Sequence, residues 1–368
     1  MEVAKVNWNS WMPSEDALMN LVDDKVVSQS LKTLTRICYV RLCKHEDYDE
    51  VIRCCAVLLN MEALKWCDMG LIMGAPISGN VLAYLASAVH HRLIDKAENF
   101  YESSTTSVAD IDDSSAGLPN PASLNLNVCE DVKRLPVQRI SCPSVMQFRE
   151  HYLTTRTPVI ITDAMCTWPA LKKWSIPYLL SKMAYRTVPI EIGSKYSDDD
   201  WSQKLLPFHQ FIADYITKHG NVGYLAQHEL FEQIVDLAED INIPDYCCLL
   251  SSPDDVDINA WFGPSGTVSP LHTDPRDNIF AQVMGSKYVS MCSPLETSKV
   301  YPYDSPLLFN TCQVDVEHPD FEKFPKFRDI TLYNCVLRPG ELLYIPFKWW
   351  HYLRSLETSF SISFWFGE

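Results

Sequence analysis

The chain has 368 residues, 47% of them hydrophobic, and a formal net charge of −16. This length accommodates two domains of ordinary size. The acidic charge argues against nucleic-acid binding through a broad basic face, since phosphate contacts need clustered lysine and arginine. The sequence has no apolar run long enough to span a membrane, no N-terminal signal pattern, and 13 scattered cysteines. We therefore expect no membrane association, and reduced thiols in the nucleus or the cytoplasm.

The first part of the chain is predicted to be helical. Apolar residues recur at helical spacing over residues 14–44, and Asp47 followed by Glu50 is typical of a capping box that starts a second helix. A third helical pattern covers residues 81–101. We expect residues 1–101 to form a small helical bundle, which carries no residue pattern that indicates catalysis.

A change of composition separates this bundle from a second predicted domain. Residues 102–132 are dominated by serine, aspartate, glycine and proline, which indicates a flexible linker. Residues 133–368 then mix short helices and strands; we predict strands at 158–162 and 187–193 and a helix at 205–218. Many short strands with helices outside them predict an α+β chain whose second domain is a double-stranded β-helix, a jelly-roll barrel.

One His-x-Asp triplet is the strongest candidate for chemistry. In an extended strand, residues two apart face the same side, so His272 and Asp274 would present an imidazole and a carboxylate together. His351, in a later strand-like segment, would complete a 2-His-1-carboxylate triad, which leaves metal positions open for a co-substrate and dioxygen. Two other triplets are weaker candidates, because residues 45–47 suit a helix cap and residues 318–320 contain a proline.

A lysine follows the triplet at a position that suits anion binding. Residues 279–291 are predicted to form a hairpin with its turn at 284–286, and Lys287 begins the returning strand among mostly apolar neighbours. Such a lysine either extends to solvent or pairs with a buried anion. Beside a metal triad, a dicarboxylate such as 2-oxoglutarate is the natural anion.

Several segments taken in order resemble one enzyme family. LHTDPRDN, VMGSKY, GELLYIPFKWWHY and SFSISFWF are similar to the JmjC-domain 2-oxoglutarate oxygenases, and the similarity extends over about residues 133–368. The resemblance implies a double-stranded β-helix that uses Fe(II), 2-oxoglutarate and O2. It implies three metal ligands: His272, Asp274 and His351. It also implies that four residues bind 2-oxoglutarate: Lys287, Tyr224, Ser269 and Asn278.

The resemblance further implies hydroxylation of arginine side chains in a protein or peptide, with histone tails among the candidates. A guanidinium group needs a carboxylate and flat aromatic surfaces, and the matching positions are Glu191, Trp201 and Trp261. The simpler alternative is that the tryptophans pack in the core and the glutamate lies on the surface. The chain stops soon after its last predicted strand, without room for the helices through which some relatives dimerise, so we expect a monomer.

Three other functions stay open. Demethylation of N-methyl-lysine in histones needs the same cofactors, although no zinc or chromatin-reader module accompanies this domain. A histone-tail peptidase is disfavoured, since no Ser-His-Asp or Cys-His spacing supports it. A catalytically inert binding module is disfavoured because all three ligand types and the lysine are present.

Overall fold

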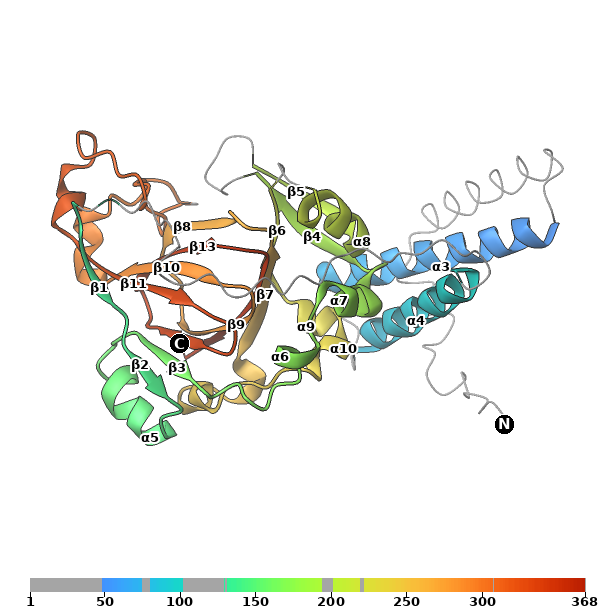
Figure 1. Cartoon of the computed structure of the whole chain (residues 1–368), viewed down its shortest axis with the longest axis horizontal. Helices are drawn as coiled ribbons and strands as arrows, with labels where there is room; N and C mark the ends of the chain where they lie inside the picture. The colour runs from blue at the N-terminus through green and yellow to red at the C-terminus, as the bar shows by residue number, and fades with distance from the viewer. Residues whose placement is uncertain are drawn as a thin grey trace. The chain divides into compact units, whose positions relative to one another are not determined.

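The computed structural model describes the following residues: 48–74, 80–101, 129, 131–193, 201–218, 222–306 and 308–367. They form two compact units, which are treated separately below (Figure 1). None of the described helices combines the length and the apolar character needed to cross a membrane. The predicted helix at 14–44, Asp47 and most of the predicted linker lie outside the described residues, and the predicted domain boundaries stay predictions.

The described part of the first unit contains two helices, α3 (Tyr48–Ile72) and α4 (Val81–Tyr101). The bounds of α4 agree with the helical pattern predicted for residues 81–101. A small apolar cluster joins the two helices through residues at helical spacing: Leu64, Cys67, Ala86 and Leu93. Two of the three predicted helices are therefore present in the part of the chain that the structure describes.

A buried ion pair belongs to the same unit. The short segment Tyr185–Thr187 clusters with the helices, and the Asp68 carboxylate of α3 accepts hydrogen bonds from Arg186 Nε (2.9 Å) and Nη2 (2.7 Å). The backbone N–H of Thr187 donates to the second Asp68 oxygen at 2.7 Å. Both charged side chains are fully buried. This charge pair is tolerated in the interior because several hydrogen bonds satisfy its carboxylate.

The second unit is built on two β-sheets (Figure 1). The five-stranded sheet has, in spatial order, β1 (Lys133–Pro136), β11 (Thr331–Leu337), β10 (Lys287–Cys292), β13 (Trp350–Ser355) and β8 (Val268–His272). The nine-stranded sheet has, in spatial order, β2 (Arg139–Ser141), β3 (Val159–Thr162), β12 (Leu342–Ile345), β9 (Asp277–Met284), β14 (Ser359–Phe366), β7 (Asp257–Gly263), β6 (Gly223–His228), β4 (Thr187–Ile192) and β5 (Ser202–Pro207).

The strands from β7 to β14 are distributed over both sheets, four in each. Within this range the chain changes sheet at nearly every connection, and β10 and β11 are the one pair of consecutive strands that lie side by side in one sheet. Two facing four-stranded layers connected in this way are the double-stranded β-helix that the sequence predicts. The fold prediction is therefore confirmed.

Three apolar clusters stabilise this unit. One lies between the two sheets and includes Phe280, Val289 and Leu353. The second covers the outer face of the nine-stranded sheet, where short helices pack: α5 (Val145–Phe148), α6 (Ala170–Lys173), α7 (Ile176–Met183), α8 (Phe208–Phe211), α9 (Leu230–Gln233) and α10 (Val235–Ala238). The third covers the outer face of the five-stranded sheet, where the irregular segment 293–330 packs. Each sheet therefore buries both of its faces.

Two local predictions are wrong. The strands on either side of Gly285 form as expected, but β9 pairs with β12 and β14 whereas β10 pairs with β11 and β13, so they do not form a hairpin. Gly285 (φ 63°) lies against the carbonyl of Thr358 and turns the chain from one sheet to the other. The predicted helix at 205–218 begins instead as β5, and helical structure starts at Phe208.

Candidate metal centre and cleft

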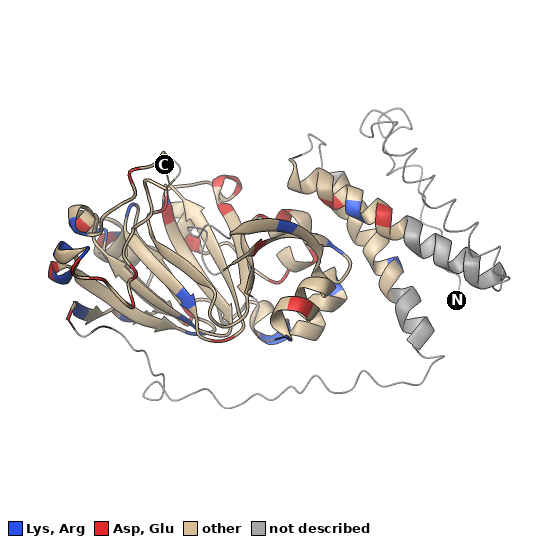
Figure 2. Ribbon diagram, turned by 90° about the horizontal axis from the view of Figure 1, so that it is seen from above, with Lys and Arg blue, Asp and Glu red and all other residues tan. Residues whose placement is uncertain are grey.

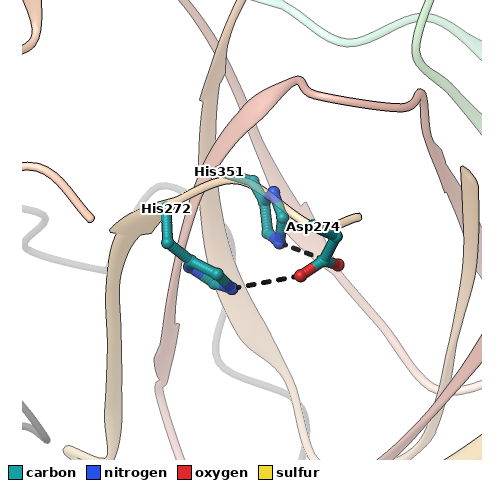
Figure 3. Close-up of side chains that lie close together, drawn as sticks. All are labelled: His272, Asp274 and His351. Carbon is teal, nitrogen blue, oxygen red and sulfur yellow. Dashed lines mark ion pairs between the residues drawn. The ribbon is translucent and has the colours of Figure 1, made fainter. Parts of the chain in front are cut away.

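Two histidines come together because neighbouring strands place them in register. His272 ends β8, and His351 is the second residue of β13. The strands are antiparallel, and the two residues are direct cross-strand partners with ring centroids 4.2 Å apart. Asp274 lies two residues past His272, beyond the end of the strand, and completes the cluster shown in Figure 3. The three residues that the sequence singles out are therefore neighbours in the fold.

The hydrogen bonds of the histidines define which ring nitrogen faces the cluster. His272 Nδ1 lies 2.7 Å from the carbonyl oxygen of Pro270, and His351 Nδ1 lies 2.9 Å from that of Trp349. A carbonyl can only accept, so each Nδ1 carries a hydrogen, and Nε2 is the ring nitrogen that can bind a metal ion once it carries no proton. The sequence could not identify these two carbonyl partners.

Both Nε2 atoms face the same carboxylate. The distance to Asp274 is 3.6 Å from His272 and 3.4 Å from His351 (Figure 3). The donor atoms of all three residues lie within 4.8 Å of one another, and this is the one such group of metal-binding side chains in the described residues. Two imidazole nitrogens and one carboxylate on a single side form the donor set of a non-haem iron site.

The carboxylate is held in its ionised form. Burial opposes ionisation of Asp274, but attraction to His351 and hydrogen bonds with both histidines more than offset it and place the pKa of the carboxyl well below its ordinary value. Burial likewise opposes protonation of His272, whose pKa is nevertheless raised because Asp274 lies next to it. Asn278 Nδ2 donates to Asp274 at 3.2 Å, while the Oδ1 of this asparagine has no hydrogen-bond partner among the described residues.

A buried cation lies near the metal cluster. Lys287, only 1% exposed, begins β10, and its Nζ donates to the hydroxyl of Tyr224 at 3.0 Å. Burial lowers the pKa of this lysine to about 7, and no carboxylate in the described part of the chain pairs with it. Tyr224 and Ser269 lie in one small cavity with Asn278 and the triad. Three of the four residues predicted for 2-oxoglutarate therefore line one cavity, and Lys287 contacts the hydroxyl of one of them, Tyr224.

The predicted substrate residues line a larger cavity of about 390 Å³ that reaches the triad. Its walls include Glu191, Trp201 and Trp261 together with His272 and Asp274. Burial raises the pKa of the Glu191 carboxyl, and the neighbouring polar groups of Trp201 and Gln203 partly offset this increase. The Trp261 indole N–H donates to Ser363 Oγ at 2.9 Å, which fixes the ring between the two cavities.

Sequence reasoning missed several residues that line the same cavity: Gln203, Gln227, Leu308, Asn310, Thr311 and Trp365. They come from β5, β6, β14 and the irregular segment, and none belongs to a local pattern that indicates a site. Of the weaker His-x-Asp triplets, residues 45–47 lie outside the described residues. In the other triplet, the Asp320 carboxylate accepts from the backbone N–H groups of Glu322 and Lys323, so it forms a local turn.

Comparison with known proteins gives consistent matches. Residues 145–368 match the cupin-like domain family. The chain is 43% identical to lysine-specific demethylase 8 of Xenopus tropicalis over 342 residues, covering 83% of this chain and 77% of that protein. The protein of the same name in Danio rerio is 48% identical over 314 residues, covering 83% and 74%. Jumonji C domain-containing protein 5 of Drosophila melanogaster is 44% identical over 237 residues, covering 62% and 59%.

Proposed function

Because the chain belongs to the cupin-like Jumonji C family of Fe(II)- and 2-oxoglutarate-dependent oxygenases, we propose that it hydroxylates arginine side chains in protein substrates. The observation that carries this proposal is Glu191, a partly buried carboxylate in an aromatic-lined cavity that reaches the His-Asp-His cluster. The metal and the co-substrate follow from the family. The residues that hold them, and the arginine preference, are our inference.

We infer that His272, Asp274 and His351 bind the iron. The donor set fits this ion, because the Nδ1 bonds to carbonyls turn both Nε2 atoms toward the carboxylate, which is ionised. Iron and 2-oxoglutarate, when bound, supply the oxidising chemistry, in which one atom of O2 enters a C–H bond of the substrate while 2-oxoglutarate becomes succinate and CO2. The protein holds these groups and excludes water.

Lys287 is the proposed partner of the far carboxylate of 2-oxoglutarate. An ammonium group that is 1% exposed and lacks a carboxylate partner among the described residues is costly, and an entering dianion removes that cost. Tyr224 and Ser269 supply hydroxyl groups on the same side. Asn278 lines the cavity proposed for the co-substrate, and its Nδ2 donates to Asp274 and orients that carboxylate.

Glu191 supports arginine as the substrate residue. Burial raises the pKa of its carboxyl, and no cation of the described chain offsets this, so a cationic substrate would stabilise the ionised form. A guanidinium offers planar N–H donors that fit a carboxylate, and its faces stack on indole rings such as Trp201 and Trp261. A trimethyl-ammonium group has no N–H to donate, so it would leave the carboxylate without a hydrogen bond.

Demethylation of methyl-lysine is the second candidate, and the names of the Xenopus and Danio relatives favour it. The same aromatic walls suit an N-methyl ammonium group. The two reactions differ in their products: hydroxylated arginine keeps the added oxygen, whereas a hydroxylated N-methyl group leaves as formaldehyde. The peptidase alternative has no supporting arrangement in the described residues.

Matched peptides separate these candidates. We would incubate the full chain with Fe(II), ascorbate and 2-oxoglutarate, and with peptides that differ only in carrying arginine, lysine or a methylated lysine at one position. Mass spectrometry should detect the mass of one added oxygen on the arginine peptide. Loss of methyl groups from the lysine peptides, with the arginine peptide unchanged, would contradict the proposal and favour demethylation.

A charge-neutralising variant tests the role of Glu191. Glu191→Gln should raise the KM for the arginine peptide at least about tenfold, because a charge-assisted pair is lost, and it should leave the KM for 2-oxoglutarate unchanged. Glu322→Gln, an equal charge change at an exposed position outside the cavity, is the control. Equal peptide KM values in the two variants would exclude Glu191 from substrate binding.

The partners are also proposed on grounds of charge. Figure 2 shows Lys and Arg residues scattered among Asp and Glu along the described ribbon, without a long basic stretch, which supports basic peptides, histone tails among them, over nucleic acid. We further propose a monomer in the nucleus or the cytoplasm. Light scattering at micromolar concentration tests the first point, and a stable dimer would contradict it.

A further inference from the structure

The connection that follows β8 is held by the irregular segment between β10 and β11. The last residue pair that joins β8 to β13 is His351 with His272, so the sheet provides no ladder bonds to Thr273 or Asp274. β8 is also the outermost strand of its sheet. The backbone between two of the proposed metal ligands would therefore lack partners unless another segment supplied them.

Residues 310–312 supply these partners. The backbone N–H of Thr273 donates to the carbonyl oxygen of Asn310 at 2.9 Å, and Cys312 N–H donates to the carbonyl of Leu271 at 2.8 Å. Thr311 and His272 form the isolated antiparallel bridge between these bonds. The segment thus adds a short strand to the free edge of β8, level with the first histidine.

One side chain extends this contact beyond the backbone pairing. Asn310 Nδ2 donates to the carbonyl oxygen of Thr273 at 3.0 Å, and the buried hydroxyl of Thr311 points to the other amide atom, Asn310 Oδ1, at 3.4 Å. Asn310 therefore binds both the N–H and the C=O of Thr273, the residue between His272 and Asp274. The two peptide groups that set the relative direction of these ligands are both fixed by one residue.

We propose that Asn310 is a positioning residue for the metal centre, which holds the His272–Asp274 backbone in the conformation that lets both side chains bind one ion. The inference rests on the proposed metal ligands but not on which substrate is hydroxylated. Asn310 also lines the larger cavity that contains Glu191. The ordinary alternative is that the segment only covers an open sheet edge.

Metal affinity without turnover separates these roles. We would measure binding of Mn(II) alone to the full chain by the electron paramagnetic resonance signal of the free ion. Asn310→Ala removes the side-chain bond to Thr273, and its Mn(II) affinity should fall about five- to tenfold, the effect of one neutral hydrogen bond. Asn310→Asp should weaken binding further, since a carboxylate cannot donate to the carbonyl and repels it.

The matched control lies in the same segment. The Gln313 side-chain amide donates to the carbonyl of Pro302 at 3.0 Å and touches neither metal ligand, so Gln313→Ala should keep wild-type Mn(II) affinity. Melting temperatures of the metal-free variants show whether each remains folded. If Asn310→Ala binds Mn(II) as tightly as Gln313→Ala does, the proposal is overturned and the segment is only an edge cover.

A further variant distinguishes failure of this inference from failure of the proposed function. His272→Ala should lose most Mn(II) binding in the same assay. If His272→Ala binds Mn(II) normally, the proposed metal ligands are wrong. If it loses binding while both Asn310 variants retain it, the ligands stand and the positioning role fails.

Discussion

The proposed co-substrate lysine leads to a pH-dependent prediction. Burial lowers the pKa of Lys287 from 10.5 to about 7, which corresponds to about 5 kcal/mol against the charged form in the folded protein. The folded-state pKa lies below the unfolded-state value. Between about pH 7 and 10.5 the unfolded chain therefore binds the additional proton, and the stability contributed by this group rises with pH.

Binding of a dicarboxylate reverses this shift, because an ion pair with Lys287 stabilises its charged form. At about pH 8, roughly one in ten of the free pockets holds a protonated lysine, so binding should take up about 0.9 proton per 2-oxoglutarate. At about pH 6 the lysine is already charged, and the uptake should fall to about 0.1. Lys287→Met cannot take up this proton and should bind 2-oxoglutarate much more weakly.

Calorimetry measures this uptake directly. 2-Oxoglutarate is titrated into the protein with Mn(II) in place of iron, in two buffers of different ionisation enthalpy, and the difference in heat gives the number of protons. Lys326→Met, which removes an exposed lysine, is the control and should behave as the wild type. Proton uptake that is absent in the wild type, or equal in the wild type and Lys287→Met, would refute the assignment of Lys287 as the partner of the far carboxylate of 2-oxoglutarate.

Two further predictions concern the metal centre and the buried ion pair. His272→Ala should lower turnover at least about a hundredfold, since losing a metal ligand has a larger effect than losing a residue that hydrogen-bonds a ligand. Wild-type turnover in a variant with an unchanged circular dichroism spectrum would contradict the metal assignment. Asp68→Ala removes the carboxylate that binds Arg186 in a fully buried site and should destabilise the protein by about 3–5 kcal/mol in thermal melts. Asp214→Ala, which breaks an exposed pair with Lys218, should barely change the melting temperature, and equal effects would refute this reasoning.

The metal centre was predictable because its residues carry chemistry in a recognisable pattern. His272 and Asp274 are two apart at a strand end, and His351 lies in a segment whose apolar run predicts a strand. What the sequence could not provide is the register that makes the two histidines direct partners, because long-range strand pairing leaves no local signal. His351 was the candidate third ligand because it lies in a second strand-like segment, and the family resemblance supports the same residue.

The two wrong predictions have different physical causes. β9 and β10 are almost entirely buried, so their sequences fit a hairpin and a sheet-to-sheet connection equally well. The exposed strand β5 lacks an alternating pattern, and its pairing in the sheet overrides the helix predicted to begin at residue 205. Asn310 lies in an irregular segment, where the contact to Thr273 depends entirely on tertiary structure.

The position of Lys287 in its sheet has a consequence for chemical selectivity. β10 and β13 are hydrogen-bonded neighbours, with Met291 opposite His351 and Lys287 four residues further along β10. In the proposed binding mode, both ends of the co-substrate are thus attached to one rigid ladder, and backbone geometry sets the span between them. The pocket should therefore select dicarboxylates by length. A dicarboxylate whose carbon chain is shorter by one atom would reach the metal or the lysine but not both.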